Sequence, residues 1–199
     1  MPKLPNPAVG ANFVDAFKTM VSRIEESIKA SGNKKLVLPV RMFVAGGAAS
    51  HFYTAKRMTD DVDATFSHRM LLPEDLEISY RDTDGKARLL YFDRQYNDTF
   101  GLLHEDAYRD STPLKLDGID PKIVEVRLLS PIDLAVSKLA RFAEHDQEDI
   151  RALAAEGLLK SKDLKKRAEE ALKHYIGNPG PIKASITLAC KMIGRSQLR

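Results

Sequence analysis

Apolar residues in the first third of the chain follow a helical period and then a strand-like one. Over residues 11–30 they recur at every third or fourth position, which predicts an amphipathic helix. The second half of the apolar run 36–45 alternates, which predicts a strand that ends at Gly46-Gly47. Small residues then predict a short helix over residues 48–56. The chain is therefore expected to open with a helix, a strand, a glycine turn and a second helix.

Short strand patterns dominate the middle of the chain. Residues 61–66 predict a strand that carries acidic side chains on alternate positions. Residues 76–81 and 86–93 predict two further strands, because the Asp-Thr-Asp-Gly sequence between them is a strong hairpin signal. Residues 96–110 are polar and predict a loop with at most a short helix. Residues 114–116 and 122–128 predict two more strands.

At Ser130 the apolar period lengthens to about 3.6 residues and stays there. Ser130 suits a helix N-cap, Pro131 the first helical position and Asp133 a capping box, so a helix is predicted to begin here. Three more helices are predicted over residues 146–156, 161–177 and 181–194. The fold class is therefore α+β, with a domain of residues 1–129 that holds a mixed sheet and flanking helices, and a helical bundle of residues 130–199 packed on it.

Composition and charge add few constraints. The chain has 199 residues, of which 43% are apolar and 30% charged, and its net charge is +3, as is ordinary for a soluble globular protein. The last third is locally basic, which fits either solvated helix faces or a surface that meets RNA phosphates. Neither alternative is excluded by the sequence.

The single cysteine and the N-terminus bear on the cellular compartment. Cys190 excludes an internal disulfide, and we expect it to be buried among apolar helix positions in a protein of the reducing cytoplasm. The N-terminus lacks the apolar stretch of a signal peptide, and the chain has no run of about 18 apolar residues. We therefore expect a cytoplasmic protein without a membrane span.

The sequence Asp61-Val62-Asp63 is the strongest candidate for chemistry. Side chains at alternate strand positions share a face, so both carboxylates are expected to stand side by side while Val62 points into the core. Two such like charges repel each other unless a cation lies between them. Mg²⁺, or Mn²⁺ in its place, is the natural cation, because it prefers hard oxygen ligands and substrate phosphates. An Asp-x-Asp sequence alone is also found at solvated strand ends. The neighbouring sequence therefore has to distinguish a metal site from a solvated strand end.

The context is a glycine turn placed between a strand and a helix. Gly46 and Gly47 allow backbone amides to approach a phosphate closely, and the helix that follows presents its N-terminal amides to the same anion. One loop is thus expected to hold a triphosphate while the next strand holds its metal. This arrangement suits in-line phosphoryl-type transfer.

These two motifs together resemble the signature of DNA-polymerase-β-type nucleotidyltransferases. The resemblance is carried by residues 44–51, Val-Ala-Gly-Gly-Ala-Ala-Ser-His, and residues 57–63, Arg-Met-Thr-Asp-Asp-Val-Asp. The second motif is most similar to the branch with Arg-x-Ser/Thr-x-Asp-h-Asp, which includes the AbiEii-like and MenA-like toxins of toxin–antitoxin modules and bacterial relatives. The resemblance spans roughly residues 40–195 and implies the polymerase-β-like mixed sheet with a helical C-terminal region.

The resemblance also assigns residues of the helical region. Residues 130–141 resemble a helix that supplies a lysine to the active site, which implies that Lys138 is catalytic and, with Arg141, binds the nucleotide. Asp146-x-x-Asp149 resembles the closing motif of the group. These two acids either orient Lys138 or favour a helix N-terminus through its dipole.

Further site residues are predicted around the carboxylate pair. The superfamily usually adds a third carboxylate, as metal ligand and general base, from a neighbouring strand; Asp93 is the choice and Glu125 the alternative. Thr59 is expected on the same strand face as Asp61. Its hydroxyl is expected to contact phosphate, or Thr59 is only the residue at which the strand begins. Arg57 is expected to pair with phosphate or with Asp60.

Taken together, these residues predict a metal-dependent nucleotidyltransferase of the 2.7.7 type. It would move a nucleoside monophosphate from a nucleoside triphosphate (NTP) to a hydroxyl of an acceptor, which is a tRNA 3′ end, a protein side chain or a small molecule. If a cognate antitoxin exists, the chain is expected to be a toxin. The alternative is a non-catalytic nucleotide-binding or regulatory protein on the same fold.

Overall fold

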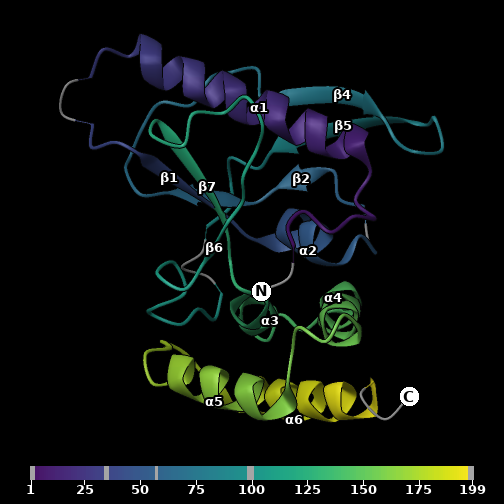
Figure 1. Ribbon diagram of the computed structural model, residues 1–199. Helices are drawn as coiled ribbons and strands as arrows, with labels where there is room; N and C mark the ends of the chain where they lie inside the picture. The colour runs from purple at the N-terminus through teal and green to yellow at the C-terminus, as the bar shows by residue number, and fades with distance from the viewer. Residues whose placement is uncertain (1–2, 34–35, 57, 98–100, 197–199) are drawn as a thin grey trace. The chain divides into compact units, whose positions relative to one another are not determined.

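The computed structural model describes residues 3–33, 36–56, 58–97 and 101–196 of the chain (Figure 1). The chain divides into two compact units. The strand unit comprises Met1–Tyr96 and Thr112–Leu128, and the helical unit comprises Asn97–Ser111 and Leu129–Arg199. The class is α+β, as predicted.

The first helix of the strand unit has the bounds that the apolar period predicts. Helix α1 spans Ala11–Ala30 and buries one face, which includes Phe13, Phe17, Met20 and Ile24. Figure 1 shows this helix lying along strand β4 (Glu77–Arg81). Burial of large apolar side chains on one stripe of α1 therefore anchors it to the sheet region.

Two sheets form the rest of the strand unit. The first has the order β3-β1-β7-β6, and its strands are β1 (Val40–Val44), β3 (Ala64–Phe66), β6 (Thr112–Pro113) and β7 (Val124–Leu128). Strand β1 pairs with β3 antiparallel and with β7 parallel, which makes this sheet mixed. The second sheet has the order β2-β5-β4, with β2 (Asp61–Val62) parallel to β5 (Ala87–Phe92).

The strand predicted over residues 61–66 is divided between the two sheets. Strand β2 belongs to one sheet and β3 to the other, and Asp63 lies at the crossing. The predicted hairpin is present, because β4 and β5 pair antiparallel across a turn in which Gly85 has a φ of +76°. The strand predicted at 114–116 was misplaced: β6 lies just before it, and the Leu114 N–H donates to the Val126 carbonyl of the neighbouring strand at 2.9 Å.

Helix α2 spans Gly46–Thr54 and so begins two residues earlier than predicted. The glycines form its first turn rather than a loop before it. Gly46 has a φ of +56°, in the left-handed region that glycine adopts without a steric penalty. The turn from β1 into α2 therefore depends on glycine at this position.

The helical unit contains α3 (Pro131–Ser137), α4 (Glu144–Ala155), α5 (Ser161–Leu172) and α6 (Pro179–Ser196). Ser130 caps α3 by accepting the Asp133 N–H, as predicted. However, α3 ends at Ser137, so Lys138 and Arg141 lie in the following turn and not in the helix that residues 130–141 were expected to form. Cys190 of α6 is half-buried rather than buried, and its Sγ lies 3.5 Å from the Ser161 carbonyl oxygen.

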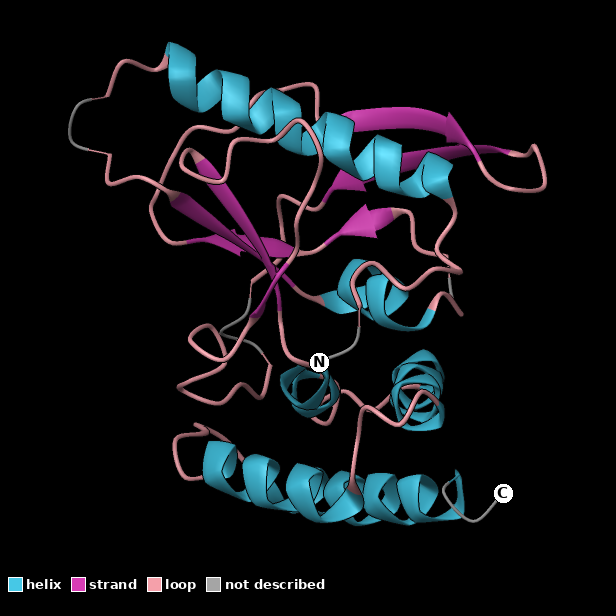
Figure 2. Ribbon diagram, in the orientation of Figure 1, coloured by secondary structure: helices cyan, strands magenta, loops and turns pink. Residues whose placement is uncertain are grey.

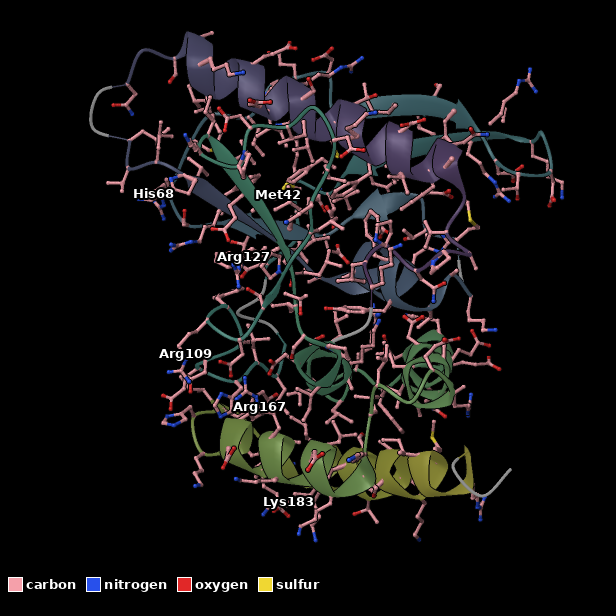
Figure 3. All side chains as sticks on the ribbon, in the orientation of Figure 1. Met42, His68, Arg109, Arg127, Arg167 and Lys183 are labelled. Atoms are coloured by element: carbon pink, nitrogen blue, oxygen red, sulfur yellow. The ribbon has the colours of Figure 1, made fainter. Side chains whose placement is uncertain are left out.

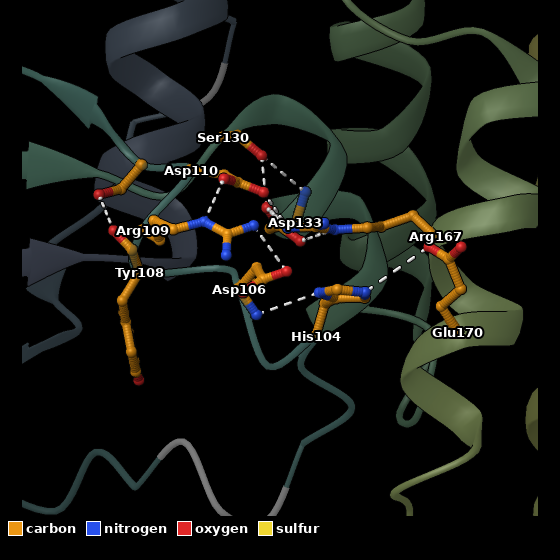
Figure 4. Close-up of polar contacts among 10 residues, drawn as sticks. His104, Asp106, Tyr108, Arg109, Asp110, Ser130, Asp133, Arg167 and Glu170 are labelled. Carbon is orange, nitrogen blue, oxygen red and sulfur yellow. Dashed lines mark hydrogen bonds and ion pairs between the residues drawn. The ribbon is translucent and has the colours of Figure 1, made fainter.

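Residues 101–111 are drawn as loop in Figure 2 and belong to the helical unit, although the sequence assigned them to the first domain. Their ion pairs explain this. Arg167 of α5 donates to Asp110 at 2.9 Å and to the fully buried Asp133 at 2.8 Å (Figure 4). His104 Nε2 lies 3.6 Å from Glu170 of the same helix. Charges that are distant in sequence thus fix this segment, and no local pattern could predict it.

Within the described residues, no helix combines the length and the apolar character needed to cross a bilayer.

Candidate active site

Asp61 and Asp63 stand where the two sheets of the strand unit meet. Val62 between them is fully buried, whereas both carboxylates are half-buried. The Asp63 carbonyl accepts the Ala45 N–H at 2.8 Å, which ties this crossing to the start of α2. The strand alternation therefore turns both acidic side chains away from the core, as the sequence predicts.

Asp93 joins this pair through strand register. Asp61 lies opposite Tyr91 and Val62 opposite Phe92, and the Asp93 N–H donates to the Val62 carbonyl at 3.1 Å. Register partners on neighbouring strands project to the same side, so Asp93 shares the face of Asp61 and Asp63. If this register continues by one residue, Asp63 and Asp93, which directly follow the two adjacent strands, lie opposite each other on the face of Asp61.

The pKa of the Tyr91 hydroxyl is raised by the charges of the neighbouring acids. The charge of Asp61, then partial burial, then the charges of Asp93, Asp60 and Asp63 raise the pKa of the Tyr91 hydroxyl above its ordinary value. A phenolate is disfavoured beside several carboxylates, so this direction shows that the acids share one negative field. The sequence analysis missed Tyr91, although it stands two positions before Asp93 in the same predicted strand.

The glycine turn is in direct contact with Asp63. A methyl group built on Gly46 would lie 1.8 Å from Asp63 Oδ2 and 2.7 Å from its Cγ. Gly46 is the first residue of α2, and its N-cap residue, Ala45, has no side chain that caps the helix. The Asp63 carboxylate thus lies at a helix N-terminus, where backbone N–H groups favour negative charge.

The second glycine contacts Thr59, which in turn holds Asp61. A methyl group on Gly47 would lie 2.6 Å from Thr59 Oγ1, and this hydroxyl donates to Asp61 Oδ1 at 2.5 Å. Thr59 is 4% exposed. Its hydroxyl proton therefore orients a carboxylate, and we assign Thr59 a positioning contact in addition to the predicted role near phosphate.

We predict that Thr59→Val lowers the affinity for Mn²⁺ and NTP about 10–100-fold, because hydrogen bonds that orient ligand carboxylates have effects of this size. Valine keeps the shape but removes the donor to Asp61. Isothermal titration of Mn²⁺ with each NTP measures the change. Thr54→Val is the matched control, because Thr54 is equally buried and its hydroxyl donates to the Ser50 carbonyl instead. Equal affinities in both variants would contradict the assignment.

Glu125, the alternative third carboxylate, lies in the other sheet and has two arginine partners. Arg41 Nε is 3.1 Å and Arg127 Nη1 is 2.5 Å from its two oxygens (Arg127 is labelled in Figure 3). Burial alone would raise the pKa of Glu125, but these hydrogen bonds and charges hold it below its ordinary value. Glu125 is thus ionised, and its negative charge is balanced by two arginines. A carboxylate held in this way is a poor proton acceptor.

The acidic side chains of this site are oxygen donors of the kind that Mg²⁺ prefers. Among the described residues, no three His, Cys, Asp or Glu side chains already converge on a point that could hold a metal ion. Mg²⁺ does not need such a cage, because it usually binds through one or two carboxylates and completes its shell with water and substrate phosphate. Asp61 and Asp63 fit that mode as hard oxygen donors on one face.

The helical unit holds the predicted Lys138 in a buried cluster. Its Nζ lies 2.6 Å from Asp149 Oδ2 and 3.7 Å from Asp146 Oδ1, and its side chain is 6% exposed. Asp146 also accepts two hydrogen bonds from Arg141, at 2.7 and 2.8 Å. Burial would raise the pKa of Asp146, but Arg141, Lys138 and the Ala143 N–H together lower it. Asp146 and Asp149 do contact Lys138; the roles of Lys138 and Arg141 toward NTP stay predictions.

We predict that Lys138→Met lowers the free energy of unfolding by about 3–5 kcal/mol, because it removes the buried cation that lies 2.6 Å from the buried Asp149 carboxylate. Urea denaturation followed by circular dichroism measures this loss. Lys166→Met, on an exposed position of α5, should change the value by no more than about 0.5 kcal/mol. If both variants are equally stable, the buried pair does not stabilise the unit.

Arg57, predicted to bind phosphate, lies outside the described residues. Of the other strand-unit candidates, Gly46 lies against Asp63, and Gly47 lies against Thr59, which donates to Asp61. Asp93 is connected to this group through its backbone bond to Val62, and the roles of all six stay predictions.

Comparison with protein families now bears on this geometry. A family model described as a nucleotidyltransferase of unknown function (DUF6036) matches residues 20–179, well over half of the chain. The chain belongs to this family. The matched region of this nucleotidyltransferase begins inside α1, ends at the first residue of α6 and includes every candidate site residue. No curated protein and no solved structure shows significant similarity to the chain.

Proposed function

We propose that this family member is a metal-dependent enzyme that transfers a nucleoside monophosphate from an NTP to a hydroxyl of an acceptor. The observation that carries the proposal is one shared strand face. Asp61 and Asp63 stand on that face at the start of α2, and Asp93 stands on it through the register of β2 with β5. Such an arrangement suits phosphoryl-type transfer, in which catalysis is mainly positioning and charge stabilisation.

The first turn of α2 is the proposed phosphate site. Glycine at positions 46 and 47 lets the side chains of Asp63 and Thr59 lie directly against this turn. A phosphate bound next to Asp63 would therefore meet the backbone N–H groups of the same turn. Helix N-termini bind such anions through N–H groups and the helix dipole. The triphosphate therefore lies against the start of α2.

Asp61 and Asp63 would hold the metal, Mg²⁺ or Mn²⁺, next to those phosphates. When bound, this ion offsets the charge of the carboxylates and of the phosphate oxygens. Thr59 keeps Asp61 in the orientation that this requires, through its hydrogen bond to Oδ1.

Asp93 is the proposed general base. Its carboxylate takes the proton of the acceptor hydroxyl as the oxygen forms a bond to the α-phosphorus. The bond from the α-phosphorus to the bridging oxygen breaks, and pyrophosphate leaves with that electron pair. Asp93 is suited to this role because it is half-buried beside the pair, whereas Glu125 is held by two arginines.

Two isotopic labels test this proposal. Purified protein is incubated with Mg²⁺, total tRNA or cell extract, and each NTP labelled on either its α- or its γ-phosphate. We expect the α-label to enter a macromolecule and the γ-label to be released as pyrophosphate. With Asp61→Asn we expect neither incorporation of the α-label nor release of labelled pyrophosphate. Transfer of γ-label would indicate a kinase and would exclude nucleotidyl transfer.

A non-catalytic protein would give a different pattern in the same assay. It would bind NTP without transferring either label, and Asp61→Asn would change binding alone. The absence of a preformed three-ligand metal group among the described residues is the observation that favours this second candidate.

We further propose that the enzyme acts as a toxin controlled by an antitoxin. The support is the sequence Arg57-Met58-Thr59-Asp60-Asp61-Val62-Asp63, which is similar to the motif of AbiEii-like and MenA-like toxins. Induced expression in a bacterial host should arrest growth with the native chain but not with Asp61→Asn. Normal growth with both chains at equal protein levels would contradict the toxin role.

A further inference from the structure

A pocket of about 460 Å³ opens beside Asp93 in the strand unit. Its wall is formed by β3, by the segment that follows β3 and by the turn that follows β5, and it includes Phe66, Phe92 and Tyr96. His68, labelled in Figure 3, also lines it. The volume is in the range of pockets that bind small organic groups.

The aromatic wall of this pocket is suited to a flat ring. Phe66 and Phe92 stack with their centroids 5.9 Å apart and an interplanar angle of 24°. Phe92 is 7% exposed and therefore fixed, while Phe66 is half-buried at the end of β3. Aromatic side chains that are held in place in this way are the usual platforms for nucleobases.

Two arginines give the same pocket a positive charge. Arg69 and Arg94 line it and are both exposed. The Arg94 guanidinium donates to the backbone carbonyls of Pro73 and Glu74, which holds it in place. Guanidinium groups suit phosphate recognition, so an aromatic wall with arginines matches a nucleotide better than it matches an apolar peptide.

A second pocket of about 450 Å³ also borders Asp93, but its wall includes Glu74 and Glu77. These carboxylates would repel an anionic ligand. The charge distribution therefore favours the pocket with Phe66 for a phosphate-bearing group.

The position of the pocket indicates which substrate it serves. Gly46 and Gly47 contact Asp63 and Thr59, which flank β2, whereas Asp93 directly follows the neighbouring strand β5. In an in-line displacement the attacking and leaving oxygens lie on opposite sides of the phosphorus. If pyrophosphate lies at the glycines, the acceptor arrives on the side of its base, Asp93.

We propose that this pocket binds the terminal nucleobase of a single-stranded polynucleotide acceptor, with Arg69 and Arg94 on its backbone phosphate. The inference rests on the proposed function and specifies its acceptor. It places the terminal ribose, which carries the attacking hydroxyl, between the aromatic wall and Asp93.

Two labelled oligoribonucleotides test the proposal on the full chain by fluorescence anisotropy. One ends in adenosine and the other has the same sequence with an abasic 3′ ribose. The native chain should bind the first about tenfold more tightly, in line with the strength of one base–aromatic stack. Phe66→Leu, which keeps apolar volume, should remove this preference, and Arg69→Gln should weaken both oligomers.

The controls separate this site from the NTP site. Lys86→Gln removes an exposed charge from the β4–β5 hairpin of the same unit and should leave both affinities unchanged. NTP binding should be unaltered in the pocket variants, and thermal melting verifies that they fold. Equal binding of both oligomers by the native chain would overturn the proposal, as would a loss of NTP affinity in Phe66→Leu. If the native chain prefers the oligomer that ends in adenosine but binds no NTP, the proposed function is refuted and the proposed base pocket is not.

Discussion

Gly46→Ala is expected to abolish nucleotidyl transfer. The new methyl group would lie 1.8 Å from Asp63 Oδ2, so either Asp63 leaves the carboxylate face or the start of α2 moves. Both movements separate the proposed phosphate site from the proposed metal ligands. The α-label assay should give no product above the level of Asp61→Asn, while circular dichroism still shows a folded chain.

Gly32→Ala is the control that distinguishes the steric clash with Asp63 from the backbone strain of a left-handed alanine. Gly32 has a φ of +57°, nearly the same as the +56° of Gly46, but none of the described residues lies within 4 Å of a methyl group built there. Both variants carry the left-handed strain of about 1–2 kcal/mol. Gly32→Ala should therefore lose similar stability and keep its activity. Full activity in Gly46→Ala would show that the contact with Asp63 does not matter.

Asp93→Asn is expected to lower the rate of transfer about 10²–10⁴-fold while NTP affinity changes little. This range is typical for the loss of a general base. The side chain keeps its size, and the backbone bond from Asp93 to Val62 is untouched. Single-turnover assays with α-labelled NTP give the rate, and titration calorimetry gives the affinity.

Glu125→Gln is the matched control, because it removes the same charge from the alternative carboxylate. Glu125 is paired with Arg41 and Arg127, so its loss should reduce stability and leave the transfer rate within about threefold of the native value. The opposite result, a slow Glu125→Gln and a normal Asp93→Asn, would reverse the assignment of the base.

Most of the fold could be predicted because its elements have local signals. The apolar period gave both ends of α1, the Asp-Thr-Asp-Gly turn gave the hairpin, and Ser130 gave the start of α3. Two features had no local signal. One is the end of α3 at Ser137, one residue before the buried Lys138. The other is the 101–111 segment, in which Asp110 pairs with Arg167 and His104 lies near Glu170.

Local sequence patterns could propose the candidate site residues but not the contacts between them. Strand alternation placed Asp61 and Asp63 on one face, and the structure adds Asp93 by strand register. The choice between Asp93 and Glu125 required knowledge of which strands are neighbours, because both occupy similar strand positions in the sequence. The contacts of Gly46 with Asp63 and of Thr59 with Asp61 also arise only when α2 meets β2.

The central claim is that Asp61 and Asp63 hold a metal ion together with the phosphates of an NTP. Electron paramagnetic resonance of Mn²⁺, titrated with and without a nonhydrolysable NTP analogue, tests it most directly. We predict that the native chain binds Mn²⁺ tightly only when the analogue is present, and that Asp61→Asn and Asp63→Asn each lose this binding. Unchanged Mn²⁺ affinity in both variants, or analogue binding that does not depend on Mn²⁺, would contradict the account.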